Sequence, residues 1–396
     1  MKFLKFACLG AVALALAGCG DSNAPANAKS EGDKAPAYEP MVAEGTVAAL
    51  QYRKNESKAF APMASAFAKC IDKGSVLHKQ GVFDEEFAKF LDDSGLNDAD
   101  VSWAMASLGE GFNLAAGLAV SAALAPKVSV VVCFKHDAEK IARAFNAVAD
   151  KDDGEKIEKF TVAGVTAWKF VSEDFPAGFV PCFASLDGEL LLAAATEESL
   201  ANEIALYRDG KGADASFGKV CSDKTAVVRL YVKSVGDLLK EATKDTPESL
   251  DAADTILPDG KNVFLGLGEL DFALTASDPA GVAYALKLVT RSEEDAESIR
   301  SVLGGFYTMA KAQCKDPKDD EEKLFAEFLN AIKLKTAGNV FAVDMPISDA
   351  LVRKAAEEME NAANEALGAG DEDDDDDGDD DGDDDDDEDD AADEAA

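Results

Sequence analysis

Apolar and polar residues alternate with regular periods along most of the chain between residues 43 and 368. Strict alternation, as in Val282, Tyr284 and Leu286, predicts strands that are buried on one side. Apolar residues spaced three or four apart predict amphipathic helices. One such stripe consists of Ile299, Val302, Leu303, Phe306 and Met309. Together the two patterns predict an α+β fold, in which a mostly antiparallel sheet packs against amphipathic helices.

The predicted elements run through both halves of this region. Turn pairs at Asp187-Gly188 and Ala337-Gly338 each predict a hairpin. We expect strands at residues 47–52, 101–108, 127–134, 157–162, 164–171, 179–186, 189–195, 225–232, 263–267, 270–276, 282–290, 333–336 and 339–345. We expect helices at residues 60–71, 84–95, 137–150, 196–210, 234–243, 247–253, 292–309, 324–332 and 348–367.

The order of these elements repeats along the chain. Each half begins with one strand and two helices, passes through several strands and reaches a long helix after a valine-rich strand. Residues 137–141 (DAEKI) and 295–299 (DAESI) open corresponding helices, 158 residues apart. We therefore expect two α+β pseudo-repeats, at residues 43–215 and 216–368.

The first eighteen residues are organised like a bacterial signal peptide. After a short basic start, an apolar run of 12 residues extends from Phe6 to Ala17, which is too short to span a bilayer. The run ends in Leu-Ala-Gly-Cys at residues 16–19, which resembles the lipobox of bacterial lipoproteins. This resemblance implies that residues 1–18 are removed and that Cys19 carries a lipid anchor in the membrane. The alternative is an ordinary signal peptide in which Cys19 occurs by chance.

Residues 19–42 are rich in Ala, Asn, Ser, Lys and Pro, and we expect them to form a flexible tether. Gly20 follows the cysteine, where some bacteria use Asp to retain lipoproteins, and this favours the outer membrane. The body loosely resembles uncharacterised two-repeat α+β bacterial lipoproteins. That resemblance is one of pattern, and it assigns no functional residue.

Charge distinguishes this chain from most globular proteins of its size. Its 396 residues include 78 acidic and 39 basic side chains, which gives a net charge of −39. So acidic a surface repels phosphate backbones, which excludes nucleic acid as a partner. The chain has two histidines, His78 and His136, and this excludes a site built from several histidines. Hydrophobic residues make up 47% of the chain, enough for a sizeable core.

The acidic residues are concentrated at the C-terminus. Residues 369–396 contain almost nothing apolar except alanine, and we expect them to be disordered. Asp377, Asp379, Asp381 and Glu388 match the spacing of an EF-hand loop and are weak metal candidates. Any aspartate run with a glycine nearly matches that spacing, and no helix follows. A solvated, repulsive tail is the favoured interpretation, and loose binding of divalent cations is the alternative.

Signatures of catalysis are largely missing from the sequence. It contains neither a G-x-S-x-G nor an H-E-x-x-H motif, and residues 212–219 have the wrong spacing for a phosphate-binding loop. His136 precedes Asp137, so it could serve acid–base chemistry, but a role at the start of a helix is favoured. Trp103 and Trp168 lie in strand patterns, and we expect them in the core.

The cysteines point to no metal or redox centre, because no C-x-x-C motif occurs. Of the seven, Cys8 lies in the leader and Cys19 in the lipobox, which leaves an odd number in the body. Buried thiols are the favoured interpretation for the rest. Among disulfides, a Cys182–Cys221 pair is the first to test, since both residues flank predicted strands.

These observations favour a lipid-anchored protein of the bacterial cell envelope, facing the periplasm or in the outer membrane, that is not an enzyme and needs no cofactor. Its role would be that of a binding or structural module. A second hypothesis makes the acidic tail the working part, as a cation-binding or cell-surface interaction segment. A third makes the body a carrier for a lipid or another hydrophobic ligand.

Overall fold

The computed structural model describes residues 38–55, 57–71, 89–90, 93–95, 101–109, 128–149, 156–173, 175, 178–242, 266–278 and 281–368. Its strands are β1 (Thr46–Arg53), β2 (Trp103–Gly109), β3 (Val128–Cys133), β4 (Lys156–Val162), β5 (Val165–Val171), β6 (Cys182–Leu186), β7 (Leu190–Ala194), β8 (Ala226–Lys233), β9 (Leu267–Ser277), β10 (Gly281–Thr290), β11 (Lys333–Ala337) and β12 (Val340–Ile347).

The helices are α2 (Ala61–Ile71), α5 (Ala138–Ala149), α6 (Glu197–Asp209), η4 (Ala215–Phe217), α7 (Gly218–Ser222), α8 (Val235–Ala242), α10 (Glu293–Gln313), α11 (Asp320–Ala331) and α12 (Asp349–Gly368). The fold is therefore α+β, as predicted. The short pair η4 and α7 was not predicted, and the strand expected at 263–267 contributes only its last residue, to β9. Residues 263–265, and the helix predicted at 247–253, lie outside the described residues.

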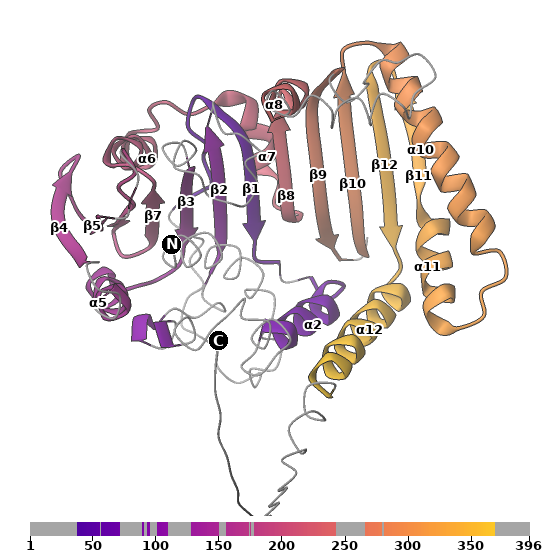
Figure 1. The fold of residues 1–396 in the computed structure, drawn as a ribbon, viewed down its shortest axis with the longest axis horizontal. Coiled ribbons are helices and arrows are strands. Elements are labelled where there is room, and N and C mark those ends of the chain that lie inside the picture. The colour runs from indigo at the N-terminus through magenta and orange to yellow at the C-terminus, as the bar shows by residue number, and fades with distance from the viewer. Residues whose placement is uncertain are drawn as a thin grey trace, which may run out of the picture.

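The described strands form one twelve-stranded sheet in the order β11-β12-β10-β9-β8-β1-β2-β3-β7-β6-β5-β4 (Figure 1). Every neighbouring pair is antiparallel. The first strands of the two halves, β1 and β8, pair at the centre, with Leu50 opposite Leu230. The two halves thus share a single sheet.

The strand order is symmetrical about this central pair. Outward from β1 it reads β1-β2-β3-β7-β6, and outward from β8 it reads β8-β9-β10-β12-β11. In each half a helix follows the third strand, α5 in one and α10 in the other. Ile141 and Ile299, which lie at the same place in the two helices, are both buried. The topology is therefore that of two pseudo-repeats, and the boundaries at 215 and 216 stay a prediction.

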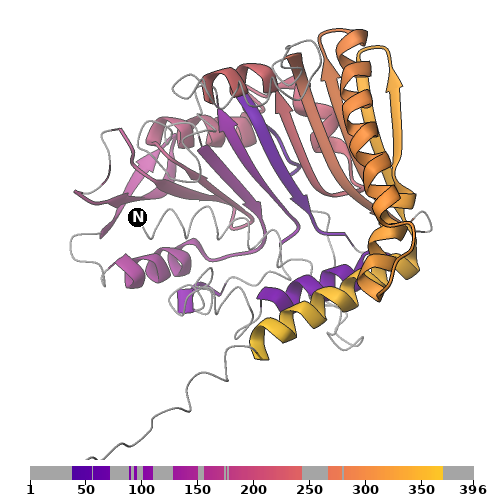
Figure 2. The same ribbon diagram turned by 45° about the vertical axis from the view of Figure 1, so that its right-hand side comes forward.

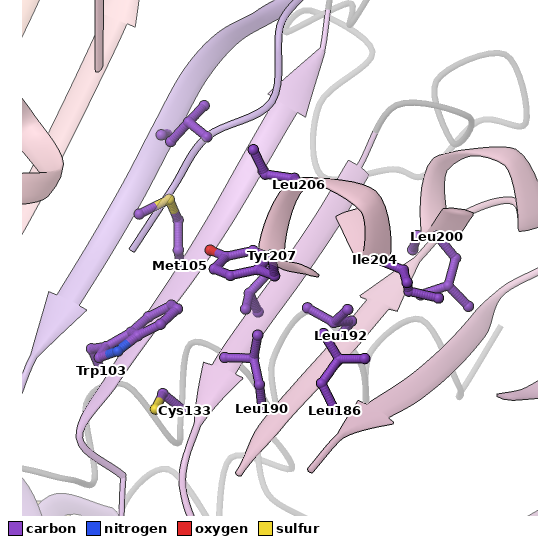
Figure 3. Close-up of a cluster of buried hydrophobic side chains, with 14 of the residues drawn as sticks. Trp103, Met105, Cys133, Leu186, Leu190, Leu192, Leu200, Ile204, Leu206 and Tyr207 are labelled. Atoms are coloured by element: carbon purple, nitrogen blue, oxygen red, sulfur yellow. The ribbon is translucent and has the colours of Figure 1, made fainter. Parts of the chain in front are cut away.

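Apolar side chains cover the first face along the sheet, and on the second face they gather over the strands of the first repeat. The first face packs against α2, α5, α11 and α12, where Tyr52, Ile141, Phe183 and Leu351 belong to one buried cluster. The second face packs against α6 and α7. Figure 3 shows side chains of α6, among them Leu200, Ile204 and Tyr207, lying over those of β2, β3, β6 and β7. Trp103 and Trp168 are both buried, as predicted.

Helix ends follow local sequence signals. The Thr196 side chain accepts a hydrogen bond from the Ser199 N–H, and Gly210 ends α6 in the left-handed region with φ of 65°. Ser292 caps α10 in the same way, by accepting from the Asp295 N–H. These caps fix where the helices begin after strands β7 and β10.

Three large apolar side chains are exposed, two of them from the predicted stripe of α10. Phe306 and Met309 of α10 and Phe325 of α11 have 52%, 54% and 53% of their surface accessible. The buried residues of α10, Ala296 and Ile299, lie near its N-terminus. The helix then runs along the β11 side of the sheet toward α11 (Figures 1 and 2). The apolar stripe is present on α10, but only its first part, with Ile299 and Leu303, packs against sheet residues.

One carboxyl group is buried beneath α6. Glu203 is only 5% exposed, and the Ser129 hydroxyl of β3 donates a hydrogen bond to it at 2.7 Å. Burial raises the pKa of Glu203, while the hydrogen bond from Ser129 acts in the opposite direction. The folded protein therefore favours the protonated acid.

We expect Glu203→Gln to alter how stability depends on pH. Because the folded-state pKa lies above the unfolded one, this group's contribution is complete below the unfolded pKa, about 4.3 for Glu, and is lost as pH rises through the folded value. Urea unfolding at about pH 5 and about pH 8 should show the wild type losing stability relative to the variant. A difference that does not change with pH would contradict burial of this carboxyl.

Candidate functional site

Several predicted site residues fall outside the described residues. These are Cys19, His78 and the tail acids Asp377, Asp379, Asp381 and Glu388. Their roles stay predictions. Within the described part of the chain, no group of three or more His, Cys, Asp and Glu side chains is placed to hold a metal ion.

His136 lies in the turn before α5, and both of its ring nitrogens have partners. Nδ1 lies 2.9 Å from the Phe134 carbonyl oxygen, and Nε2 lies 2.8 Å from the Ser185 hydroxyl. A carbonyl can only accept, so Nδ1 carries the proton and Nε2 accepts from Ser185. Burial lowers the pKa of His136. Asp137 caps α5 instead, by accepting from the N–H groups of Glu139 and Lys140.

Cys133, Cys182, Cys221 and Cys314 are free thiols, and Cys314 is only partly buried. Cys133, Cys182 and Cys221 are buried, so the interpretation as buried thiols is confirmed for these three, and Cys182 and Cys221 are not paired. Burial raises the pKa of the Cys182 thiol to about 12 and that of Cys221 to about 11. Thiols of such high pKa remain protonated and unreactive at neutral pH.

Charged side chains gather on the second face at the centre of the sheet. Arg229 of β8 donates to both carboxylate oxygens of Asp271 on β9, at 2.9 and 2.7 Å, and to Asp223 at 2.9 Å. Tyr231 donates to Glu269 at 2.8 Å. The neighbouring acids raise the pKa of the Arg229 guanidinium, and they outweigh its burial.

These charges fasten residues 214–223, which include η4 and α7, to the central strands. Lys233 of β8 forms an ion pair with Asp214. Arg53 of β1 donates to the Cys221 carbonyl at 3.1 Å and pairs with Glu39. Residues from both halves take part, so this network also joins the repeats. A bidentate ion pair in half-buried surroundings fixes the relative orientation of its two side chains more firmly than an exposed ion pair does.

Gln51 is the exception within this polar region. It is 2% exposed on β1, opposite Met105 on one side and Arg229 on the other. Neither its amide nitrogen nor its amide oxygen has a hydrogen-bond partner among the described residues, and the same holds for Nε of Arg53. A buried amide without partners opposes folding.

A groove lies at the far edge of the sheet, between α10 and β11. Its volume is about 430 Å³, and it is lined by Glu297, Arg300, Ser301, Gly304, Tyr307, Thr308 and Leu334. Six of these residues come from one side of α10, at positions 297, 300, 301, 304, 307 and 308. The Tyr307 hydroxyl lies 3.0 Å from the Leu329 carbonyl, which holds the end of α11 against this helix.

Two polar contacts shape this groove. Arg300 pairs with Glu297 at 3.2 Å, and the Thr336 hydroxyl of β11 donates to the other oxygen of Glu297. Both contacts lower the pKa of Glu297, with the hydrogen bond from Thr336 making the larger contribution. The groove is mostly polar, and it holds no acid–base pair of perturbed pKa.

Comparison with known proteins adds little to this description. No protein-family model matches the chain, and no curated protein matches it. Among solved structures, the fold is weakly similar to "Structure of crystal form I of TP0453", with 12% sequence identity and a TM-score of 0.36. The match covers 83% of this chain and 100% of that chain. So distant a likeness carries no argument about function.

We expect Gln51→Met to stabilise the protein. Methionine has a similar length and packs without hydrogen bonds, so the variant should gain about 1–3 kcal/mol in free energy of unfolding. Gln51→Glu is the matched control, and it should destabilise because it buries a charge. Chemical denaturation measures both. A loss of stability in Gln51→Met would mean that the amide is satisfied in solution.

Proposed function

We propose that this protein is a lipid-anchored component of the bacterial cell envelope that acts as a non-enzymatic binding or structural module. The observation that carries the proposal is the sequence Leu-Ala-Gly-Cys at residues 16–19, placed directly at the end of an apolar run. Small residues before a cysteine suit lipid attachment followed by cleavage at that position. Several acyl chains anchor a protein stably, whereas one chain does so only marginally.

The rest of the chain supports an anchored body. Residues 19–37 would provide a hydrophilic tether between the lipid and the body. Residues 38–42, which the sequence assigned to this tether, instead pack against the body: Val42 is 3% exposed, and the Trp103 indole N–H donates to the Tyr38 carbonyl at 2.9 Å. Such a tether leaves the body free to meet partners near the membrane surface. The described helices include none that is both long enough and apolar enough to cross a bilayer.

Binding or scaffolding is favoured over catalysis for two reasons. His136 and Ser185 are bonded to each other within the packed first face, and the groove described above lies at the opposite end of the sheet. The charges at the sheet centre are paired with one another, as expected of a structural network. The mostly polar lining of the groove also argues against a carrier of hydrophobic ligands.

The acidic tail supports a second candidate function, the binding of cations or of a basic surface. Residues 371–396 hold 20 of the 78 acidic side chains and no Lys or Arg. Carboxylates are the ligands that Ca²⁺ and Mg²⁺ prefer. Without a rigid cage, however, they bind these ions weakly and with little selectivity.

Lipid attachment is tested by Cys19→Ser. We expect the variant to lose palmitate labelling and to leave the membrane fraction, because Cys19 alone completes the lipobox. Cys8→Ser is the matched control, since it changes a cysteine in the same leader outside the motif, and it should label normally. Continued labelling of Cys19→Ser would overturn the proposed anchor.

The role of the tail is tested by calorimetry with Ca²⁺ on chains 1–396 and 1–370. We expect many weak, unselective sites that disappear with the tail, and a body of unchanged stability. Changing Asp377, Asp379 and Asp381 to Asn should weaken binding only in proportion to the charge removed. A single tight site that requires these residues would instead make the tail a specific cation-binding segment.

A further inference from the structure

The two pseudo-repeats differ at their outer edges. Strands β6 and β11 occupy equivalent positions, each following outward from the strand that pairs with β3 or β10. In the first repeat the hairpin of β4 and β5 extends the sheet, because β5 pairs with the outer side of β6. In the second repeat β11 is the last strand of the described sheet. Its outer backbone groups therefore lack a strand partner among the described residues.

Helices α5 and α10 lie over these equivalent strands in matching register. An offset of 158 residues aligns Ile141 with Ile299, and both are buried. The same offset aligns Phe145 with Leu303, and each packs against the apolar cluster beneath its helix. It also aligns Glu139 with Glu297, which lines the groove.

In the first repeat, the β4–β5 hairpin contacts this side of the helix. Lys159 of β4 forms an ion pair with Glu139 of α5. Phe170 of β5 meets Phe145 with ring centroids 5.2 Å apart. Trp168 of β5 stacks on Phe183 of β6, at 5.2 Å and an angle of 14° between the rings. The hairpin thus supplies both a strand and two aromatic side chains.

In the second repeat, the groove lies at the corresponding place. It has Glu297 on its helical side, at the position that Glu139 holds against β4. Leu334 of β11 forms its floor, at the position of Phe183 on the face that the helix covers. The volume of about 430 Å³ is in the range of small-molecule and side-chain pockets.

We propose that the β11 edge and the adjoining groove bind an extended segment of a partner protein, which adds an antiparallel strand to the sheet. This segment carries an aromatic side chain that lies over Leu334, as Trp168 lies over Phe183. Main-chain hydrogen bonds to the edge provide affinity, and the groove selects the side chain. The inference rests on the proposed function, since it specifies what kind of partner the binding module takes.

The lysine side chains of β11 lie away from the groove, so an uncharged strand can approach the groove side of this edge. Lys333 and Lys335 alternate with Leu334, so they point to the opposite face of the sheet. Lys335 is paired there with Asp344 at 2.6 Å. Lysines on an edge discourage unspecific pairing. The two lysines thus restrict access on one face, and the face under α10 remains uncharged at Leu334 and Thr336.

Two glycines of α10 allow a matched test. A Cβ added at Gly304 would lie 4.0 Å from the Leu334 side chain, so Gly304→Leu fits and fills the groove. A Cβ added at Gly305 meets nothing within 4 Å, and Gly305 does not line the groove. Both changes replace a helical glycine with a good helix former, so neither is expected to impair folding.

The probe is a synthetic peptide with the sequence of residues 164–172 (GVTAWKFVS), and a W168A version serves as the control peptide. Its binding to the full-length chain is measured by calorimetry, and hydrogen exchange locates it. We expect wild type and Gly305→Leu to bind alike, and Gly304→Leu and the control peptide to bind at least about tenfold more weakly. Protection from exchange should be confined to residues 333–337.

The proposal would be overturned by equal binding by Gly304→Leu and wild type, by protection at the β4 edge instead, or by no binding of the peptide at all. Self-association without peptide that Gly304→Leu abolishes would assign the groove to a second copy of the chain, and would overturn it too. Palmitate labelling of Cys19 is measured separately. If Cys19 is labelled but the peptide does not bind, the proposed peptide site is wrong and the proposed lipid anchor still stands.

Discussion

The antiparallel pairing of β1 with β8 is the contact on which the architecture depends. Each repeat contributes its first strand to this pair, and every other strand is added outward from it. The charged network around Arg53 and Arg229 lies over the same strands and fastens residues 214–223 across them. Without the central pair, each repeat would expose the edge of its first strand, and that edge would be open to unintended pairing.

The symmetry about this pair is incomplete within the described residues. Helix α6 closes the second face of the first repeat, whereas α12 crosses to the first face and packs beside α2 (Figure 2). The second face of β9, β10 and β12 therefore carries residues such as Lys287 and Asp344, beside small ones such as Ala285. Among the described residues, helix α6 covers the second face of the first repeat, whereas the second repeat has no helix on this face and no strand beyond β11.

Much of this fold could be predicted from the sequence, because periodic burial is a local signal. Alternation located β10, and the caps at Thr196 and Ser292 marked where α6 and α10 begin. Exposure of Phe306 could not be predicted, since a stripe does not tell how far the neighbouring sheet extends. Burial of Gln51 depends on coverage by a distant segment. No sequence motif marks the groove, because its lining residues form the ordinary polar side of an amphipathic helix.

The contact between α2 and α12 joins the two ends of the folded body. Residues 61–71 begin the first repeat, and residues 349–368 end the second, yet the two helices lie side by side in both ribbon views (Figures 1 and 2). During synthesis the N-terminal part of the chain emerges first. The apolar surface around α2 therefore stays uncovered until α12 has been synthesised. Such a chain completes its fold only after almost all of it has been synthesised, and until then its exposed apolar surface makes it prone to aggregation.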